Sequence, residues 1–141
     1  LVETAVDRLV TSIRNHCADV ADLSTLIERL VQAHNRFFLE NQEMFLLLFQ
    51  GRVMLKLQRE NLEDLERPYL TYLEETQAHV ARFVPKGVDA VRLRRFTCAL
   101  AGFVSGYFSF AMIGMPQEEM ESSLGPVRKA FVGASSAFLG S

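Results

Sequence analysis

The chain has 141 residues, of which 49% are hydrophobic and 23% are charged, and its formal net charge is −2. This length and composition fit one globular domain with a single core and exclude a disordered or fibrous chain. The charge excludes the basic face that a free-standing nucleic-acid binder normally presents, so we expect this chain alone to bind DNA poorly.

Helical periodicity runs through the first half of the chain, and no segment alternates as a β-strand does. Apolar residues at steps of three and four between residues 2 and 20 predict a first helix. Asp22 and Ser24 are candidate caps for a second helix that extends to Phe38. Asn41 is expected to cap a short third helix, and Gly51 to mark its end or a bend.

The second half predicts three longer helices. One spans residues 62–83, and Pro68 is expected to kink or break it. Pro85 to Gly87 is the clearest loop, and Asp89 can cap the next helix, which stops at residues 114–116. The last segment has apolar residues at alternating steps of three and four up to Phe138, interrupted by a kink or a separate turn at Gly125-Pro126. The total is six or seven helices.

The fifth predicted helix contains FTCALAGFVSGYFSFAMIGM, residues 96–115, a stretch without a single charge. Its length and its Gly102-x-x-x-Gly106 spacing would suit a membrane span. The alternative is a helix buried all round, between its own domain and a partner subunit. The hydroxyl and glycine residues in the stretch, and the amphipathic helices around it, favour the second interpretation and no membrane association.

Motifs for catalysis, phosphate binding and metal binding are absent from the sequence, so we expect neither an enzyme nor a bound cofactor or metal. Glu75 and His79 lie one helical turn apart, which is typical of an exposed polar pair. Cys17 and Cys98 fall far apart within helical patterns, and we expect two free thiols in a reducing cytoplasm. No basic segment followed by an apolar run opens the chain, so no signal peptide is predicted.

Three segments carry a family resemblance. Residues 38–49, FLENQEMFLLLF, resemble a recurring stretch of TetR-family transcriptional regulators, in which a phenylalanine-rich helix ends at an Asn-Pro-Glu-like turn before a short Leu/Phe-rich helix; here Gln42 stands where proline is common. Residues 99–106 are similar to the family's penultimate helix, and residues 123–139 resemble its last. The resemblance extends over residues 1–141, in the order of the family's ligand-binding and dimerisation domain.

This resemblance implies a single all-α domain, an irregular bundle of about six helices whose last two form a four-helix interface in a homodimer. It also implies that a small molecule enters a cavity among the middle helices and controls DNA binding by a helix-turn-helix domain, which would lie upstream and is absent from this chain. The alternative from another class is a small helical adaptor or scaffold without a ligand, which predicts a packed interior with no cavity of about 300 Å³ or more.

The candidate ligand-binding residues are aromatic or polar side chains on otherwise apolar faces, and all of them have plain core packing as their alternative. No acidic residue lies on these faces, so we expect a small, largely apolar effector. Which face of the fifth helix lines the pocket and which meets the partner stays open. The candidates are His34, Met44, Phe45, Phe49, Tyr69, Tyr72, Thr76, Phe96, Leu100, Phe103 and Tyr107.

The candidate dimer interface combines small residues of the fifth helix with the apolar row of the last helix. A lone helical domain rarely leaves such a row facing water, although packing within the same chain is the alternative. The candidates are Gly102, Gly106, Leu124, Val127, Phe131, Ala134 and Phe138.

Overall fold

The computed structural model describes residues 2–57 and 62–139, apart from some helical side chains, among them those of Phe49 and Leu124. Within these residues the chain is all-helical and contains no strand, as the periodicity predicts. The six α-helices are α1 (Val2–Cys17), α2 (Leu23–Glu40), α3 (Gln42–Met54), α4 (Leu62–Ala81), α5 (Ala90–Gly114) and α6 (Gln117–Phe138), and a 3₁₀ turn (Leu55–Leu57) follows α3.

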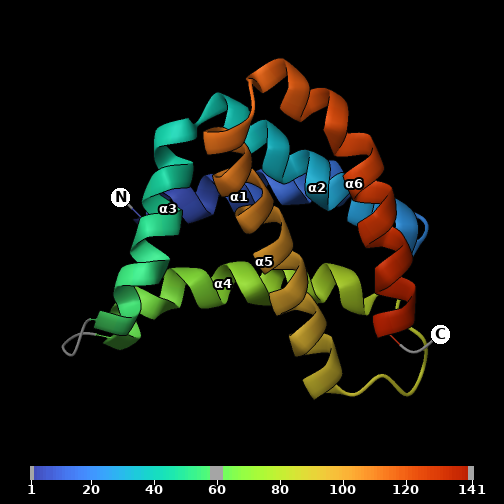
Figure 1. Cartoon of the computed structure of the whole chain (residues 1–141). Helices are drawn as coiled ribbons and strands as arrows, with labels where there is room; N and C mark the ends of the chain where they lie inside the picture. Colours follow the sequence, from blue (N-terminus) through green and yellow to red (C-terminus); the bar gives the residue numbers. More distant parts are fainter. Residues whose placement is uncertain (1, 58–61, 140–141) are drawn as a thin grey trace.

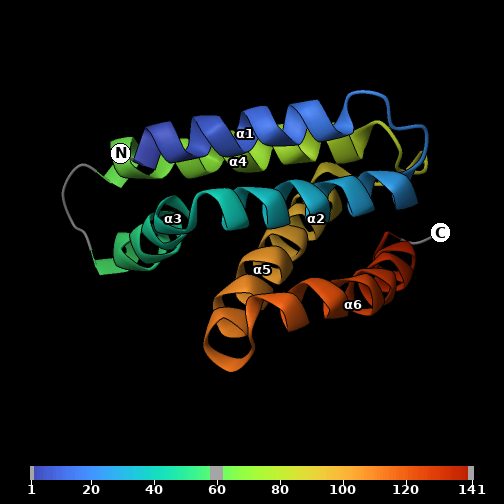
Figure 2. The ribbon, with the colours of Figure 1, turned by 90° about the horizontal axis from the view of Figure 1, so that it is seen from above.

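The helices form an irregular stack rather than a parallel bundle (Figures 1 and 2). α1 and α4 lie side by side along one side of the molecule, and α2 and α3 lie next to them. α5 crosses in front of α4 in Figure 1, and α6 covers the side away from α1. This arrangement leaves the middle of α5 facing α4 on one side and α6 on the other.

Two of the predicted caps are confirmed. The Asp22 carboxylate accepts a hydrogen bond from the Thr25 amide at 2.7 Å at the start of α2. The Asp89 carboxylate accepts one from the Arg92 amide, also at 2.7 Å, at the start of α5. In the loop before α5, Gly87 has a φ of 97°, a left-handed conformation that favours glycine. These local signals fix where the two helices begin.

Other local predictions have a mixed outcome: the side-chain cap at Asn41 and a helix end at Gly51 are wrong, whereas prolines inside continuous helices are compatible with the predicted kinks. Asn41 precedes α3, but its side chain makes no capping hydrogen bond. α3 continues through Gly51, α4 through Pro68, and α6 through Pro126. A proline removes one backbone hydrogen bond. Pro68 is buried, so tertiary packing can offset this loss in α4. Figure 1 shows α6 bending along its length, which fits the kink predicted at Gly125-Pro126.

The core is dominated by phenylalanines from three helices. Phe38 of α2 stacks on Phe108 of α5, with ring centroids 5.4 Å apart, and Phe45 of α3 meets both rings edge-on. Phe38 and Phe108 are fully buried, and each such ring removes a large apolar area from water, which favours folding. This aromatic cluster holds α2, α3 and α5 together, and Phe45 also lines the cavity described next.

Candidate functional site

An apolar cavity of about 250 Å³ lies between α1, α2, α3, α4 and α5. Its lining is almost wholly hydrocarbon, with a few polar atoms on α2, α4 and α5. Cys98 and Gly102 are exposed as well as lining it, so the cavity meets solvent between α4 and α5. The lining residues are Val6, Leu9, His34, Phe37, Phe45, Leu48, Tyr69, Tyr72, Leu73, Cys98, Ala101, Gly102 and Ser105.

A hydrogen-bonded chain of three groups supplies the main polar feature of the wall. The His34 Nδ1 atom lies 2.6 Å from the backbone carbonyl oxygen of Leu30, and His34 Nε2 lies 2.7 Å from the Tyr72 hydroxyl. A carbonyl oxygen only accepts, so Nδ1 carries the proton and donates it to Leu30. The bare Nε2 of the neutral ring then accepts from Tyr72.

Burial keeps this histidine neutral. His34 is 5% exposed, and desolvation lowers the pKa of its imidazole from 6.5 to about 4, against the smaller opposing effect of the hydrogen bond to Leu30. At neutral pH the wall therefore carries no imidazolium. It offers no charge that could hold a carboxylate or a phosphate at this point.

Tyr69 lines the cavity and contacts α3. Its hydroxyl donates to the Leu48 carbonyl at 2.9 Å, and the same oxygen packs directly against Gly51. A Cβ atom on residue 51 would collide with that oxygen, so Gly51 serves a close contact between α3 and α4. This contact explains why a glycine sits inside a helix whose end it was expected to mark.

The middle of α5 has three faces with different neighbours. Phe96, Leu100, Val104 and Phe108 are buried in the core. The strip of small residues Cys98, Ala101, Gly102 and Ser105 lines the cavity. Further round the helix, Ala99, Gly102, Phe110 and Ile113 are exposed, the last two at 77% and 85%. Within the described residues no helix is long and apolar enough to cross a membrane.

The cavity brings together His34, Phe45, Tyr69 and Tyr72 from the predicted ligand-binding set. The sequence did not single out Val6, Leu9, Phe37, Leu48 or Leu73, since nothing in their spacing separates a cavity wall from a core. The strip of small residues on α5 was recognisable in the sequence, but the sequence did not show whether this strip faces the cavity or a partner subunit. The structure places that strip at the cavity, where the aromatic face had been the candidate.

The other predicted ligand-binding residues lie elsewhere. Thr76 is buried and its hydroxyl donates to the Tyr72 carbonyl at 2.9 Å, one turn back along α4. Met44 is half-buried against the core, with its sulfur 3.8 Å from the Arg8 guanidinium. Phe96 and Leu100 are core residues, Phe103 and Tyr107 stack on each other beside the core cluster, and the side chain of Phe49 lies outside the described residues.

Part of the predicted dimer interface packs within its own chain. Phe131 of α6 stacks on Phe103 with ring centroids 4.3 Å apart, and Phe138 lies against Phe96 at 5.8 Å. Ala134 and Gly102 are exposed, Val127 and Gly106 are half-buried, and the side chain of Leu124 is outside the described part of the structure. For Phe131 the alternative of packing within the chain is therefore the one observed.

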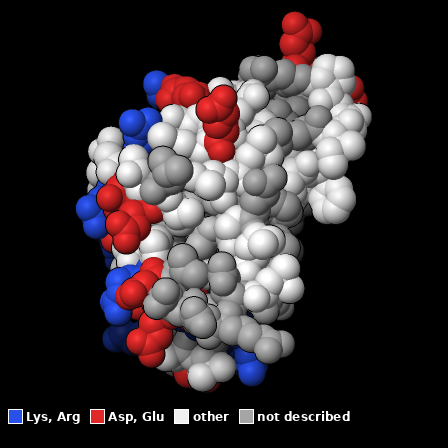
Figure 3. All heavy atoms as spheres, turned by 90° about the vertical axis from the view of Figure 1, so that its left-hand side faces the viewer, with Lys and Arg blue, Asp and Glu red and all other residues white. Residues whose placement is uncertain are grey.

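An apolar, uncharged surface remains beside these contacts. Figure 3 shows charged side chains gathered on its left, over the α1 and α4 side, whereas the right-hand side, where α5 and α6 lie, is almost free of them below the acidic side chains at its top. Phe110 and Ile113 of α5 are among the most exposed large apolar side chains described. We call Ala99, Gly102, Gly106, Phe110 and Ile113 the α5 stripe.

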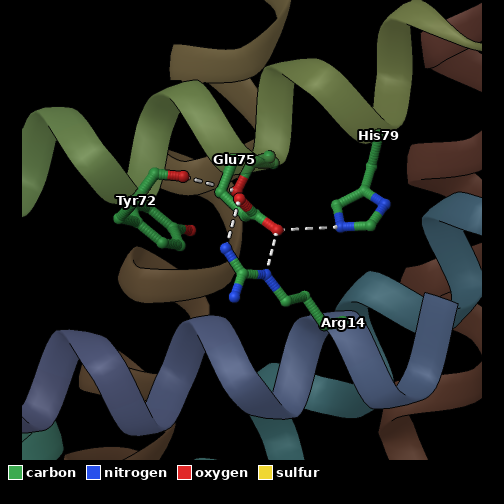
Figure 4. Close-up of polar contacts among 5 residues, drawn as sticks. Arg14, Tyr72, Glu75 and His79 are labelled. Carbon is green, nitrogen blue, oxygen red and sulfur yellow. Dashed lines mark hydrogen bonds and ion pairs between the residues drawn. The ribbon is translucent and has the colours of Figure 1, made fainter. Parts of the chain in front are cut away.

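A polar cluster joins α1 to α4 one turn from the cavity (Figure 4). The Arg14 guanidinium binds both Glu75 carboxylate oxygens, at 2.6 and 3.1 Å, and lowers the pKa of that carboxyl. His79 Nε2 lies 3.5 Å from Glu75, an ion-pair distance, and burial lowers its pKa. The expectation of an exposed pair is wrong here, because α1 covers both side chains in part.

Metal-binding clusters of three or more His, Cys, Asp or Glu are absent from the described residues. Cys17 and Cys98 are both free thiols, as expected, the first buried and the second exposed at the cavity. The chain matches no protein-family model, no curated protein and no solved structure.

Proposed function

We propose that this chain is the small-molecule-sensing and dimerisation domain of a TetR-type transcriptional regulator, in which ligand binding controls an upstream helix-turn-helix domain. The observation that carries the proposal is the apolar cavity with the His34–Tyr72 hydrogen bond in its wall. Ligand pockets are commonly apolar with a few placed polar groups, and the lining of this cavity has that composition. The volume of about 250 Å³ is below the roughly 300 Å³ that separates the sensor from a ligand-free adaptor, so the lining and not the volume favours the sensor.

The size of the cavity limits the ligand. Its volume of about 250 Å³ is slightly below the roughly 300 Å³ at which drug-sized pockets begin, and above the roughly 150 Å³ in which an engineered core cavity binds benzene. A molecule of one or two rings, or a short branched chain, would fill it. This supports a small, largely apolar effector.

The position of the cavity supports a signalling role. Val6 and Leu9 of α1 line it, and Arg14 ties α1 to α4 through Glu75, one turn beyond Tyr72. α1 is the helix that would lead to an upstream DNA-binding domain. A ligand that moves α4 would therefore act on α1 through direct contacts and through this ion pair.

The α5 stripe supports a second copy of this chain as the partner. Its apolar side chains face solvent together with small residues that permit a close approach. α6 borders the same side of the molecule. A homodimer that buries both helices would cover this surface and the adjoining opening of the cavity.

Filling the cavity tests the ligand-sensing proposal. Ala101 lines the cavity, and we expect Ala101→Leu to abolish the rise in unfolding temperature that small apolar aromatic compounds produce in the wild-type chain. The matched control is Ala78→Leu, on an exposed position of α4, which should keep the response. Differential scanning fluorimetry measures both. An equal response of the two variants, or none from the wild type, would contradict the proposal.

A further inference from the structure

The cavity has a closed end and an open end, which differ in the exposure of the residues that line them. The lining residues of α4 are half-buried, and on α5 Cys98 and Gly102 are exposed. The described lining residues of α1 and α2 are all buried, namely Val6, Leu9, His34 and Phe37. The closed end therefore lies against α1 and α2, and the opening lies between α4 and α5.

Gly102 lies where the cavity reaches the surface of the molecule. The four lining residues of α5, at positions 98, 101, 102 and 105, share one face of the helix because they are spaced by about one turn. Ala101 and Ser105 are half-buried on that face, whereas Gly102 is exposed as well as lining the cavity. Gly102 therefore belongs to the rim of the opening.

No packing contact requires a glycine at position 102. A Cβ atom there would meet no side chain and no other segment within 4 Å, its two chain neighbours aside. Gly51 is the contrasting case, because the Tyr69 hydroxyl fills the space beside it. Glycine is a poor helix former, so its effect at position 102 is to leave the rim of the cavity unobstructed.

A ligand in this cavity is confined at one end only. The described lining includes no Lys, Arg, Asp or Glu, so an uncharged, apolar molecule is favoured. Its inner end is enclosed by the buried residues of α1 and α2. A molecule longer than the closed part of the cavity has space to continue past Gly102 towards solvent.

We propose that position 102 sets the length of the apolar molecule that the cavity admits. The inner end of the ligand lies against α1 and α2, and its outer end passes between α4 and α5 over Gly102. The class of ligand is an uncharged ring that carries a short alkyl chain. The proposal rests on the proposed function, since it assumes that the cavity holds a ligand, and it makes Gly102 a specificity-determining residue.

Two probes of different length test this. Toluene and n-propylbenzene share the ring and differ by two methylene groups. Isothermal titration calorimetry on the full chain should give a dissociation constant about tenfold lower for n-propylbenzene, since each buried methylene group strengthens binding roughly fourfold at most. In Gly102→Val the new side chain occupies the rim, so most of this preference should be lost while the affinity for toluene stays within about twofold. Gly102→Ala, with a smaller side chain and the better helix former, should lose part of it.

Gly106→Val is the matched control. Gly106 lies one turn further along α5, belongs to the same α5 stripe, has the same open surroundings and is not among the described lining residues. An effect of valine on helix stability or on association between copies is therefore common to both variants, and Gly106→Val should keep the preference for n-propylbenzene.

Three results would overturn the role of Gly102 and leave the cavity a ligand site. They are equal affinities of the wild type for the two probes, an unchanged preference in Gly102→Val, and an equal loss of preference in Gly102→Val and Gly106→Val. If neither probe binds the wild type, the proposed function fails together with this inference.

Discussion

His34 shows how one residue is committed to a single protonation state. Its imidazole is enclosed by apolar side chains, donates to Leu30 and accepts from Tyr72, so a proton on Nε2 would break one hydrogen bond and place a charge in the core. Hydrophobic spacing in the sequence marked His34 as a polar intrusion and favoured a satisfied core histidine over a ligand contact. The structure shows both ring nitrogens satisfied within the protein, one by Tyr72 38 positions away, and places the residue in the cavity lining.

Acid should destabilise the protein through this histidine. The unfolded chain takes up the proton near pH 6.5 and the folded chain only near 4, so His34 contributes its full stability above about pH 6.5 and loses it as the pH falls towards 4. Between pH 7.5 and 5.0 we expect a loss of about 2 kcal/mol in the free energy of unfolding.

Urea unfolding of the wild type and of His34→Leu at these two pH values checks the prediction. His79, whose pKa is also lowered, adds a loss of the same sign to both proteins, and the comparison removes it. A variant that loses as much stability as the wild type between the two pH values would show that His34 is not the group responsible.

At the scale of elements, α3 and α4 depend on one close contact. The Tyr69 hydroxyl fills the space beside Gly51, so Gly51→Ala should destabilise the fold by about 1–3 kcal/mol even though alanine is the better helix former. Tyr69→Phe removes the colliding oxygen, and the double variant Gly51→Ala/Tyr69→Phe should recover most of the loss. Chemical denaturation of the three variants measures this coupling. Strictly additive effects would contradict it.

The elements themselves were largely predictable, because helix starts and apolar periodicity are local signals. The caps at Asp22 and Asp89 and the order of six helices follow from neighbouring residues. Gly51 misled the prediction of a helix end, since the contact with Tyr69 that it serves comes from a distant segment. The site was predicted in part. Polar residues such as His34 and Tyr72 stood out on apolar helix faces, but apolar lining residues such as Leu9 are of the same residue types as those of the core.

At the scale of the whole molecule, the distribution of charge divides the surface. The α1 and α4 side is charged, and the side of α5 and α6 presents the α5 stripe (Figure 3). A homodimer formed through this side should be disrupted by a charge at its most exposed positions. We expect Phe110→Lys/Ile113→Lys to convert a dimer into a monomer in sedimentation velocity experiments.

Leu70→Lys provides the matched control, because Leu70 is an exposed apolar residue of α4, outside the stripe. It should leave the sedimentation coefficient unchanged. A wild-type chain that sediments as a monomer of 15.9 kDa, or a stripe variant that stays dimeric, would contradict the interface.

The three-sided environment of α5 has a consequence for how the protein can diverge. Some of its residues pack in the core, others line the cavity and others form the α5 stripe, and Gly102 both lines the cavity and belongs to the stripe. Many helices have one solvent-facing side that tolerates substitution. On α5, a substitution that changes the cavity lining can also change the surface that a partner would contact. Altering what the cavity accepts without altering how the protein associates is therefore easiest from α4, whose Tyr69 and Tyr72 line the cavity but do not belong to the α5 stripe.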